Sequence, residues 1–356
     1  EMTSSLVGSE MCIRDRASVS YGIGDKTETV NGYCSPKDFE TMMQLTYLTF
    51  TAPRRDDEAF ASYKNRNKAA LLNQEMNPNV AFSDSITFAL QMGHPRTIRM
   101  KADMIDNMDY DKILAMYQDR YKDASDFTFI LVGNVDVESM KPLIAEYLGA
   151  LPAINRKESF KDNKIEYRKG VYKNEFVREQ ETAKASNFVS FIGTCKYDLK
   201  NSILQDMTCQ IMDLVYTEKV REDEGGTYGV YVGGNLSKYP KEIAGIQIVF
   251  DTAPSKREKL MKIIFAEIEH ISKEGPSQAN LNKVKEFMLK KHAEDLKENS
   301  YWMGSIDEYL FTGMNPIKNY EQTVNSITAK DIQKFADDLF KQKNEVEVSM
   351  ISPDKE

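Results

Sequence analysis

The chain has 356 residues, and its 47 basic and 55 acidic side chains give a formal net charge of −8 at pH 7. A chain of this length is expected to form two domains, each with its own hydrophobic core. Mean hydropathy is −0.52 and no apolar run approaches the roughly 18 residues of a membrane span, which excludes a membrane-spanning protein. Lysines and arginines alternate with acidic residues and form no basic stripe, which argues against a nucleic-acid-binding protein.

The first sixteen residues, 1–16, are predicted to be foreign to the protein. Leu6 to Asp15 (LVGSEMCIRD) matches the translation of a transposon adapter used in sequencing libraries, and such segments are excluded from fold reasoning. The alternative is a genuine N-terminal segment, but it has neither the basic nor the apolar region of a signal peptide. We therefore expect native sequence to begin near Ala17, which leaves Cys12 outside the native protein.

Similar features recur in the same order at an offset of about 219 residues, as in a tandem repeat. Each copy has a helix that closes on an aromatic residue, followed by a short β-branched or aromatic run that predicts a strand. The matched pairs are residues 108–113 with 327–332, Tyr121 with Phe340, the runs 127–132 with 346–351, His94-Pro95 with Asn315-Pro316, Ser35-Pro36 with Ala253-Pro254, and Phe60 and Tyr63 with Leu281 and Val284. We predict a first module over 17–152, truncated at its N-terminus by about 65 residues, a polar linker over 153–170, and a second module over 171–356.

The second copy alternates between strand and helix patterns. Strands are expected over residues 188–192, 226–233 and 246–250, and helices over 204–220 and 256–273. Gly275-Pro276 ends the last of these helices, and Ser277 can cap the next one. Strands that pair beside helices on one face imply an α+β fold with two layers in each module.

The sequence predicts no catalytic metal site. Neither H-E-x-x-H nor H-x-x-E-H occurs, and zinc peptidases with those motifs need two histidines four positions apart on one helix face. His270 and His292 lie on successive predicted helices and could approach each other, but hydrogen-bonded or solvated structural roles are expected for all histidines, His94 included. No C-x-x-C pair occurs, so free buried thiols are expected at Cys34, Cys195 and Cys209.

One segment stands out at the end of the long predicted helix of the second copy. A glycine turn follows Arg221, and Tyr228 opens the next predicted strand. An arginine fork can hold a peptide carbonyl or carboxylate, and a tyrosine hydroxyl can donate to an oxyanion. Structural roles are the alternative. Tyr228 shares strand parity with Val230 and Val232 and so could be a core residue, while Arg221 could pair with an acidic neighbour such as Glu222.

From Ala17 onward, the sequence resembles the insulinase/pitrilysin-type zinc metallopeptidases, the inverted zincins. Arg221 and Tyr228 resemble the arginine–tyrosine signature in the C-terminal half of these enzymes. The stretches at 132–136 (VGNVD) and 147–152 (YLGALP) resemble the recurring end of their modules, and the tandem repeat itself is typical of them. The resemblance is closest to the long four-module bacterial members, in which this chain would form a truncated third and a complete fourth module.

The resemblance implies the mitochondrial-processing-peptidase/LuxS-like metallohydrolase fold and an enzyme made of two halves. The N-terminal catalytic half, in the same polypeptide or as a separate subunit, would carry the H-x-x-E-H helix and the zinc. This chain would bind no cofactor itself and would meet a peptide substrate. Tyr228 would stabilise the tetrahedral oxyanion, and Arg221 would position the peptide.

Three functions therefore stay open. The first is the C-terminal, substrate-binding half of a zinc metalloendopeptidase that hydrolyses peptides or small unfolded proteins, with the fragment alone inactive. The second is a non-catalytic partner subunit of a separate zinc-bearing peptidase, and the third is a scaffold module that has lost the chemistry. Because bacterial relatives of this kind are often exported, the periplasm or cell envelope is the expected location, with the cytoplasm as the alternative.

Overall fold

The computed structural model describes residues 17–223 and 229–353. The described residues form two compact units: one holds those up to Gln74 together with Met100–Lys161, and the other holds Glu75–Arg99 together with those from Asp162 onward. In the described residues, no helix combines the length and the apolar character that crossing a membrane requires.

The first unit is built on a hairpin covered by a helix. β1 (Ala17–Ile23) and β2 (Glu28–Cys34) pair antiparallel, with Ala17 opposite Cys34. The chain continues through η1 (Pro36–Asp38) into α2 (Phe39–Thr51), which packs against both strands. The remaining elements are α3 (Asp57–Glu75), α5 (Ala102–Asp106), α6 (Tyr110–Tyr121), η2 (Ala124–Asp126) and α7 (Val137–Tyr147).

Tyr121, the aromatic residue predicted to close α6, anchors this helix to the hairpin. Its side chain is fully buried, and its hydroxyl lies 2.8 Å from the carbonyl oxygen of Gly22 and 3.0 Å from that of Thr29. Burial raises the pKa of Tyr121 to about 12, so the hydroxyl keeps its proton and can donate to these carbonyls. The aromatic closure of the helix is confirmed, and its role is to hold both strands.

The strand predicted over residues 127–132 is wrong, since the structure has no strand there. Two of its apolar side chains are nevertheless packed: Phe127 lies edge-on against Phe50, with ring centroids 4.9 Å apart, and Leu131 joins the cluster around α2 and α7. A strand also needs a backbone partner. In the described part of this unit, the one ladder joins β1 to β2, so an apolar run without a neighbouring strand stays irregular.

Asp123 fastens the end of α6 to the segment that leaves this unit. Its buried carboxylate accepts hydrogen bonds from the Ser125 hydroxyl at 2.6 Å and from the backbone N–H groups of Ile154 and Arg156 at 3.0 and 2.6 Å. These bonds, with the Ser125 hydroxyl contributing most, hold the pKa of Asp123 well below its usual range. A carboxyl with a lowered folded-state pKa stabilises the fold above its unfolded-state pKa, and this stabilisation is lost as the pH falls.

We therefore expect Asp123→Asn to lower the melting temperature at neutral pH and to flatten the loss of stability below about pH 4. Melting curves recorded from neutral to acidic pH check this result. The matched control is Asp126→Asn, because Asp126 is exposed. Equal melting curves for the two variants would contradict the role given to Asp123.

The second unit contains a five-stranded sheet in the order β3-β7-β4-β6-β5. Its strands are β3 (Val171–Val177), β4 (Ala185–Thr194), β5 (Val230–Ser237), β6 (Ile243–Thr252) and β7 (Glu345–Ile351). β3 and β7 are parallel, and the other neighbours are antiparallel. The strands predicted over 188–192, 246–250 and 346–351 are confirmed with longer extents. The strand predicted over 226–233 starts at Val230 among the described residues and runs further, because its pairing with β6 continues to Ser237.

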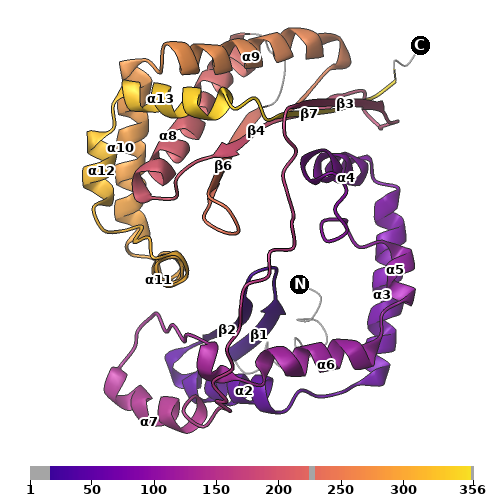
Figure 1. Ribbon diagram of the computed structural model, residues 1–356, viewed down its shortest axis with the longest axis vertical. Coiled ribbons are helices and arrows are strands. Elements are labelled where there is room, and N and C mark those ends of the chain that lie inside the picture. Colours follow the sequence, from indigo (N-terminus) through magenta and orange to yellow (C-terminus); the bar gives the residue numbers. More distant parts are fainter. Residues whose placement is uncertain (1–16, 224–228, 354–356) are drawn as a thin grey trace. The chain divides into compact units, whose positions relative to one another are not determined.

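One face of this sheet carries a layer of helices (Figure 1). They are α8 (Leu199–Tyr216), α9 (Arg257–Lys273), α10 (Gln278–Asp295), α12 (Tyr320–Ser326) and α13 (Ala329–Phe340). The helix predicted over 256–273 is confirmed, as is the cap at Ser277, whose hydroxyl oxygen accepts from the N–H of Asn280 at 3.2 Å. The helix predicted over 204–220 begins earlier, because Asp198 caps it. The α+β fold with a sheet layer and a helix layer is confirmed.

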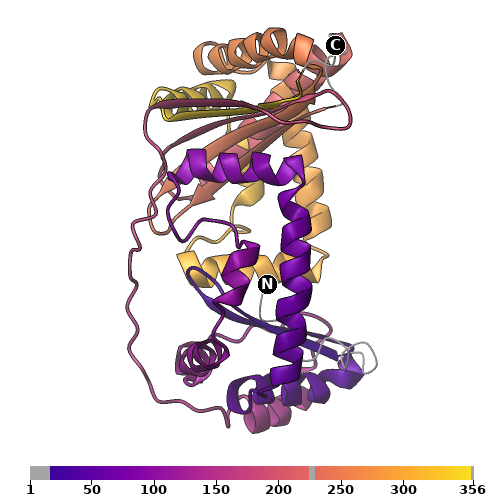
Figure 2. The ribbon, with the colours of Figure 1, turned by 90° about the vertical axis from the view of Figure 1, so that its right-hand side faces the viewer.

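Helix α4 (Pro78–Gln91) covers part of the opposite face of the sheet (Figures 1 and 2). Phe82 and Ala89 are buried there against a cluster that includes Phe188 of β4 and Val348 of β7. Arg168 fastens the helix end, since its guanidinium donates to the carbonyl of Ala89 at 2.6 Å. By sequence α4 lies in the first predicted module, and tertiary packing places it in the second unit.

The order of elements repeats along the chain. A hairpin, a short 3-10 helix and a series of helices run from β1 to α6, and again from β5 through η4 (Pro254–Lys256) and α11 (Asn299–Thr312) to α13. The residues that directly precede α6 and α13 cap these helices in the same way. The carboxylate of Asp109 accepts a hydrogen bond from the N–H of Lys112, and the hydroxyl oxygen of Thr328 accepts one from the N–H of Asp331. Residues 152–169 form no helix or strand, and the module boundaries stay a prediction.

Candidate functional site

The described structure covers the two ends of the segment that carries Arg221 and Tyr228. The backbone of Arg221 belongs to η3 (Thr217–Asp223), a π-helical continuation of α8. The side chain of Arg221 and the whole of Tyr228 lie outside the described residues. The roles predicted for these two residues therefore stay predictions. The structure describes the helical residues before the segment and the strand β5 after it.

Both ends of this segment are anchored in the same hydrophobic core. Val220 at one end is fully buried, Val230 at the start of β5 is also buried, and both belong to the main core cluster. Gly234 permits the close approach of α8 to β5, because a Cβ there would lie 2.8 Å from Cys209 Sγ and would also overlap the Gln205 amide. The two described ends of the segment therefore enter one hydrophobic core.

Asp206, Cys209 and Asp213 lie along one face of α8, where Cys209 is buried, Asp213 is half-buried and Asp206 still reaches solvent. Desolvation raises the pKa of Asp206 to about 6 and that of Cys209 to about 12. It also raises the pKa of Asp213, although a backbone hydrogen bond from Val232 of β5 opposes this shift. Carboxylates in such surroundings favour a nearby cation or take up a proton in weakly acidic solution.

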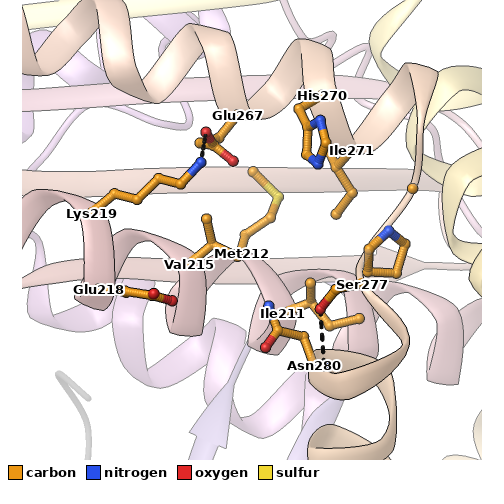
Figure 3. Close-up of a pocket in the computed structure, with 12 residues that line it drawn as sticks. Ile211, Met212, Val215, Glu218, Lys219, Glu267, His270, Ile271, Ser277 and Asn280 are labelled. Carbon is orange, nitrogen blue, oxygen red and sulfur yellow. Dashed lines mark hydrogen bonds and ion pairs between the residues drawn. The ribbon is translucent and has the colours of Figure 1, made fainter.

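A pocket of about 150 Å³ lies beside η3, between α8, α9 and the start of α10 (Figure 3). Ile211 and Ile271 belong to its apolar wall, while Lys219 and Glu267 supply charged groups. Lys219 extends from η3 toward α9, and its Nζ lies 2.5 Å from a carboxylate oxygen of Glu267 (Figure 3). The side chain of Glu267 is only 13% exposed and that of Lys219 is 47% exposed, so the pair lies at the edge of the pocket.

Each histidine has a local structural partner. His94 Nδ1 lies 3.2 Å from the backbone N of Arg96, and the buried His292 places Nδ1 2.9 Å from the hydroxyl of Tyr301. His270 is half-exposed and lies 3.5 Å from Glu274. In the part of the chain that the structure describes, no three histidine, cysteine or acidic side chains gather as a metal site, so these residues do not fit zinc.

Cys34, Cys195 and Cys209 are free among the described residues, but their burial differs from the expectation. Cys209 is buried, whereas Cys34 and Cys195 are half-buried. Burial raises the pKa of Cys195 to about 11, so this thiol stays protonated at neutral pH. A reactive thiolate is therefore not supported at this position.

The family model described as "Peptidase M16 inactive domain" matches residues 107–288, which is just over half of the chain and includes Arg221 and Tyr228. The chain belongs to this family. The resemblance to insulinase/pitrilysin-type zinc peptidases is thereby confirmed. The match begins just before α6 and ends within α10, so it covers the β5–β6 hairpin and the helices around the pocket.

Two curated relatives are zinc proteases by name. The chain is 25% identical over 289 residues to a "Zinc protease PQQL-like" protein of Arabidopsis thaliana, covering 76% of this chain and 30% of the relative. It is 21% identical over 312 residues to the "Probable zinc protease PqqL" of Haemophilus influenzae, covering 84% of this chain and 33% of the relative. The chain thus spans about a third of the length of these relatives.

Solved structures show the same fold. The periplasmic protease PqqL from Escherichia coli superposes with a TM-score of 0.80 at 15% identity, over 96% of this chain and 38% of that one. The ferredoxin protease FusC, solved in complex with Arabidopsis ferredoxin, gives 0.79 at 14% identity, over 99% and 39% of the two chains. A peptidase M16 inactive domain from Pseudomonas fluorescens gives 0.77 at 18% identity, over 99% and 88%.

The sequence did not point to Lys219 and Glu267 as a pair. They are 48 positions apart and lie on different helices, so no local motif connects them. The spacing of apolar residues is a signal for the burial of Glu267. It neighbours Ile264, Ile268 and Ile271, which belong to the buried face of α9. A carboxylate beside such a face needs a cationic partner, and the sequence alone does not identify which lysine supplies it.

Proposed function

We propose that this chain is the C-terminal, substrate-binding half of a zinc metalloendopeptidase that hydrolyses peptides or small unfolded proteins. In this proposal a separate catalytic half holds the zinc. Arg221 positions the peptide backbone, and Tyr228 donates a hydrogen bond to the oxyanion that forms at the scissile carbonyl. The modules are the truncated one over residues 17–152 and the second over 171–356, joined by the linker 153–170.

The observation that carries this proposal is the anchoring of the Arg221–Tyr228 segment within a matched inactive-domain region. Val220 and Val230, which flank the segment, are buried in the same core, and the matched region includes both of them. Two relatives named as zinc proteases support a peptidase as the complete protein. The similarity to the periplasmic PqqL supports a location in the periplasm or cell envelope, with the cytoplasm as the alternative.

A zinc-binding measurement tests the division of roles between the two halves. We expect the isolated chain, dialysed against zinc and then against buffer, to retain no stoichiometric zinc and to cleave no peptide, because its described residues offer no ligand cluster. Metal analysis and a fluorogenic peptide assay check this expectation. One equivalent of retained zinc together with zinc-dependent hydrolysis would overturn the proposal.

Sequencing source DNA across the junction upstream of Ala17 separates a fused catalytic half from a partner subunit. A continuous reading frame that encodes H-x-x-E-H supports a single polypeptide. A frame that starts after one module without this motif supports a partner subunit, or a scaffold that has lost the chemistry.

A further inference from the structure

The segment η3 combines an uncommon helical geometry with specific contacts to its neighbours. π-Helical turns are rare and are frequent at functional sites. Before the turn, the hydroxyl of Tyr216 donates to the carbonyl oxygen of Ile264 on α9 at 3.1 Å. Burial raises the pKa of Tyr216 well above its ordinary value, so this donor is always protonated. Within the turn, Val220 is fully buried in the core.

The side of η3 that faces α9 borders a pocket, which Glu218 and Lys219 help to line. The pocket of about 150 Å³ lies on this side, so part of the space between η3, α8 and α9 has no side chain filling it. The Lys219–Glu267 ion pair bridges η3 and α9 at this place (Figure 3). A fully exposed ion pair contributes little to stability, but the Glu267 carboxylate is largely buried and would otherwise lack its cationic partner.

The register of this turn decides where the next residue points. Each residue of an α-helix turns the chain by about 100° and advances it by about 1.5 Å, so relaxing a π-helical turn to an α-helical one reorients everything after it. Arg221 follows directly on Val220 and lies within the same turn. A misplacement of about 1 Å can cost about 100-fold in rate when a group must position a substrate.

We propose that Lys219 and Glu267 are positioning residues, whose ion pair holds η3 in its π-helical register and so fixes the backbone from which Arg221 acts. The hold of the ion pair on η3 concerns this chain alone. The final step of the inference, the effect on peptide handling, rests on the proposed function. Neither residue is assigned a contact with substrate.

Amide hydrogen exchange on the whole chain tests the structural part. We expect Glu267→Gln to speed exchange in residues 217–223 by at least about tenfold, while the amides of β6 and of the rest of α9 keep their protection. The double variant Lys219→Glu with Glu267→Lys is expected to restore slow exchange, because it rebuilds the pair with reversed charges. The matched control is Glu269→Gln, since Glu269 pairs with Lys273 on the exposed side of the same helix.

Either of two results in the Glu267→Gln variant would overturn the inference. One is unchanged exchange in residues 217–223 of the Glu267→Gln variant. The other is faster exchange that spreads equally over α9, β6 and η3, because this would show a general loss of stability and no specific hold on the turn. Failure of the charge-reversed variant to recover protection, although it melts like the parent chain, would also count against the pair.

An activity measurement in the complete peptidase tests the last step separately. Glu267→Gln is expected to raise KM about tenfold at nearly constant kcat, and the charge-reversed variant is expected to recover the parent KM. If Arg221→Lys changes neither KM nor kcat, the proposed function fails, while the exchange experiment still decides the role of the ion pair. If Arg221→Lys raises KM and Glu267→Gln does not, the positioning inference fails and the proposed function stands.

Discussion

Replacing Tyr228 with Phe in a complete peptidase, formed by this chain and a zinc-bearing half, is expected to lower kcat by about 10²–10³-fold with little change in KM. The hydroxyl is proposed to donate to a charge that exists only as the tetrahedral intermediate forms. Its removal should therefore affect the chemical step more than substrate binding. Steady-state kinetics with a fluorogenic peptide measures both parameters.

Tyr231→Phe is the matched control for this experiment. Tyr231 is a second tyrosine close by, on β5, where its side chain is 60% exposed. Losing its hydroxyl leaves no buried group without a partner, so we expect kcat within about twofold of the parent enzyme. Unchanged kcat in the Tyr228 variant favours the scaffold function. Equal losses in both variants would argue that the effect does not belong to Tyr228 in particular.

Phe250→Ala is expected to produce the largest loss of stability among the substitutions considered, about 3–5 kcal/mol. Phe250 lies on β6, is 2% exposed, and belongs to the main core of the second unit. Shortening it removes apolar contacts and leaves a cavity between the sheet and the helix layer. Urea unfolding followed by tryptophan fluorescence measures this loss, because the single tryptophan, Trp302, lies on α11 of the same unit.

The expected shift is a midpoint lower by about 1–2 M urea at an unchanged slope. Phe287→Ala is the matched control, because Phe287 lies on α10 with 56% of its surface exposed. We expect this control to keep the free energy of unfolding within about 0.5 kcal/mol of that of the parent chain. Similar shifts for the two variants would contradict the assignment of Phe250 to the core and of Phe287 to the surface.

Several elements follow from local sequence alone. The helix α9 has its apolar residues at helical spacing, Gly275 follows it with a positive φ of 78°, and Ser277 caps the next helix. Such elements depend on side chains close in sequence, which is why pattern and capping rules predict them. The repeat is predictable for the same reason, because it copies a whole set of local signals along the chain.

The predictions that differ from the structure concern segments whose conformation depends on residues far away in the chain. The run at 127–132 has the composition of a strand but no ladder partner in the described part of its unit. The helix predicted over 204–220 is confirmed, but its last residues lie in a π-helical turn that starts at Thr217. Val220 of this turn is buried in the core, and Lys219 pairs with Glu267 on another helix. Neither circumstance can be read from the residues next to the segment.

By itself, the sequence determined the family of this protein, the α+β class and the tandem order of its elements, and it predicts Arg221 and Tyr228 as the candidate pair. Those properties depend on local residue patterns and on the spacing of motifs. Only the tertiary structure decided that α4 covers the sheet of the second unit, and that the Arg221 segment starts from a π-helical turn beside a pocket. Packing between surfaces far apart in the chain selects these arrangements, and their free energy depends on contacts that no local window contains.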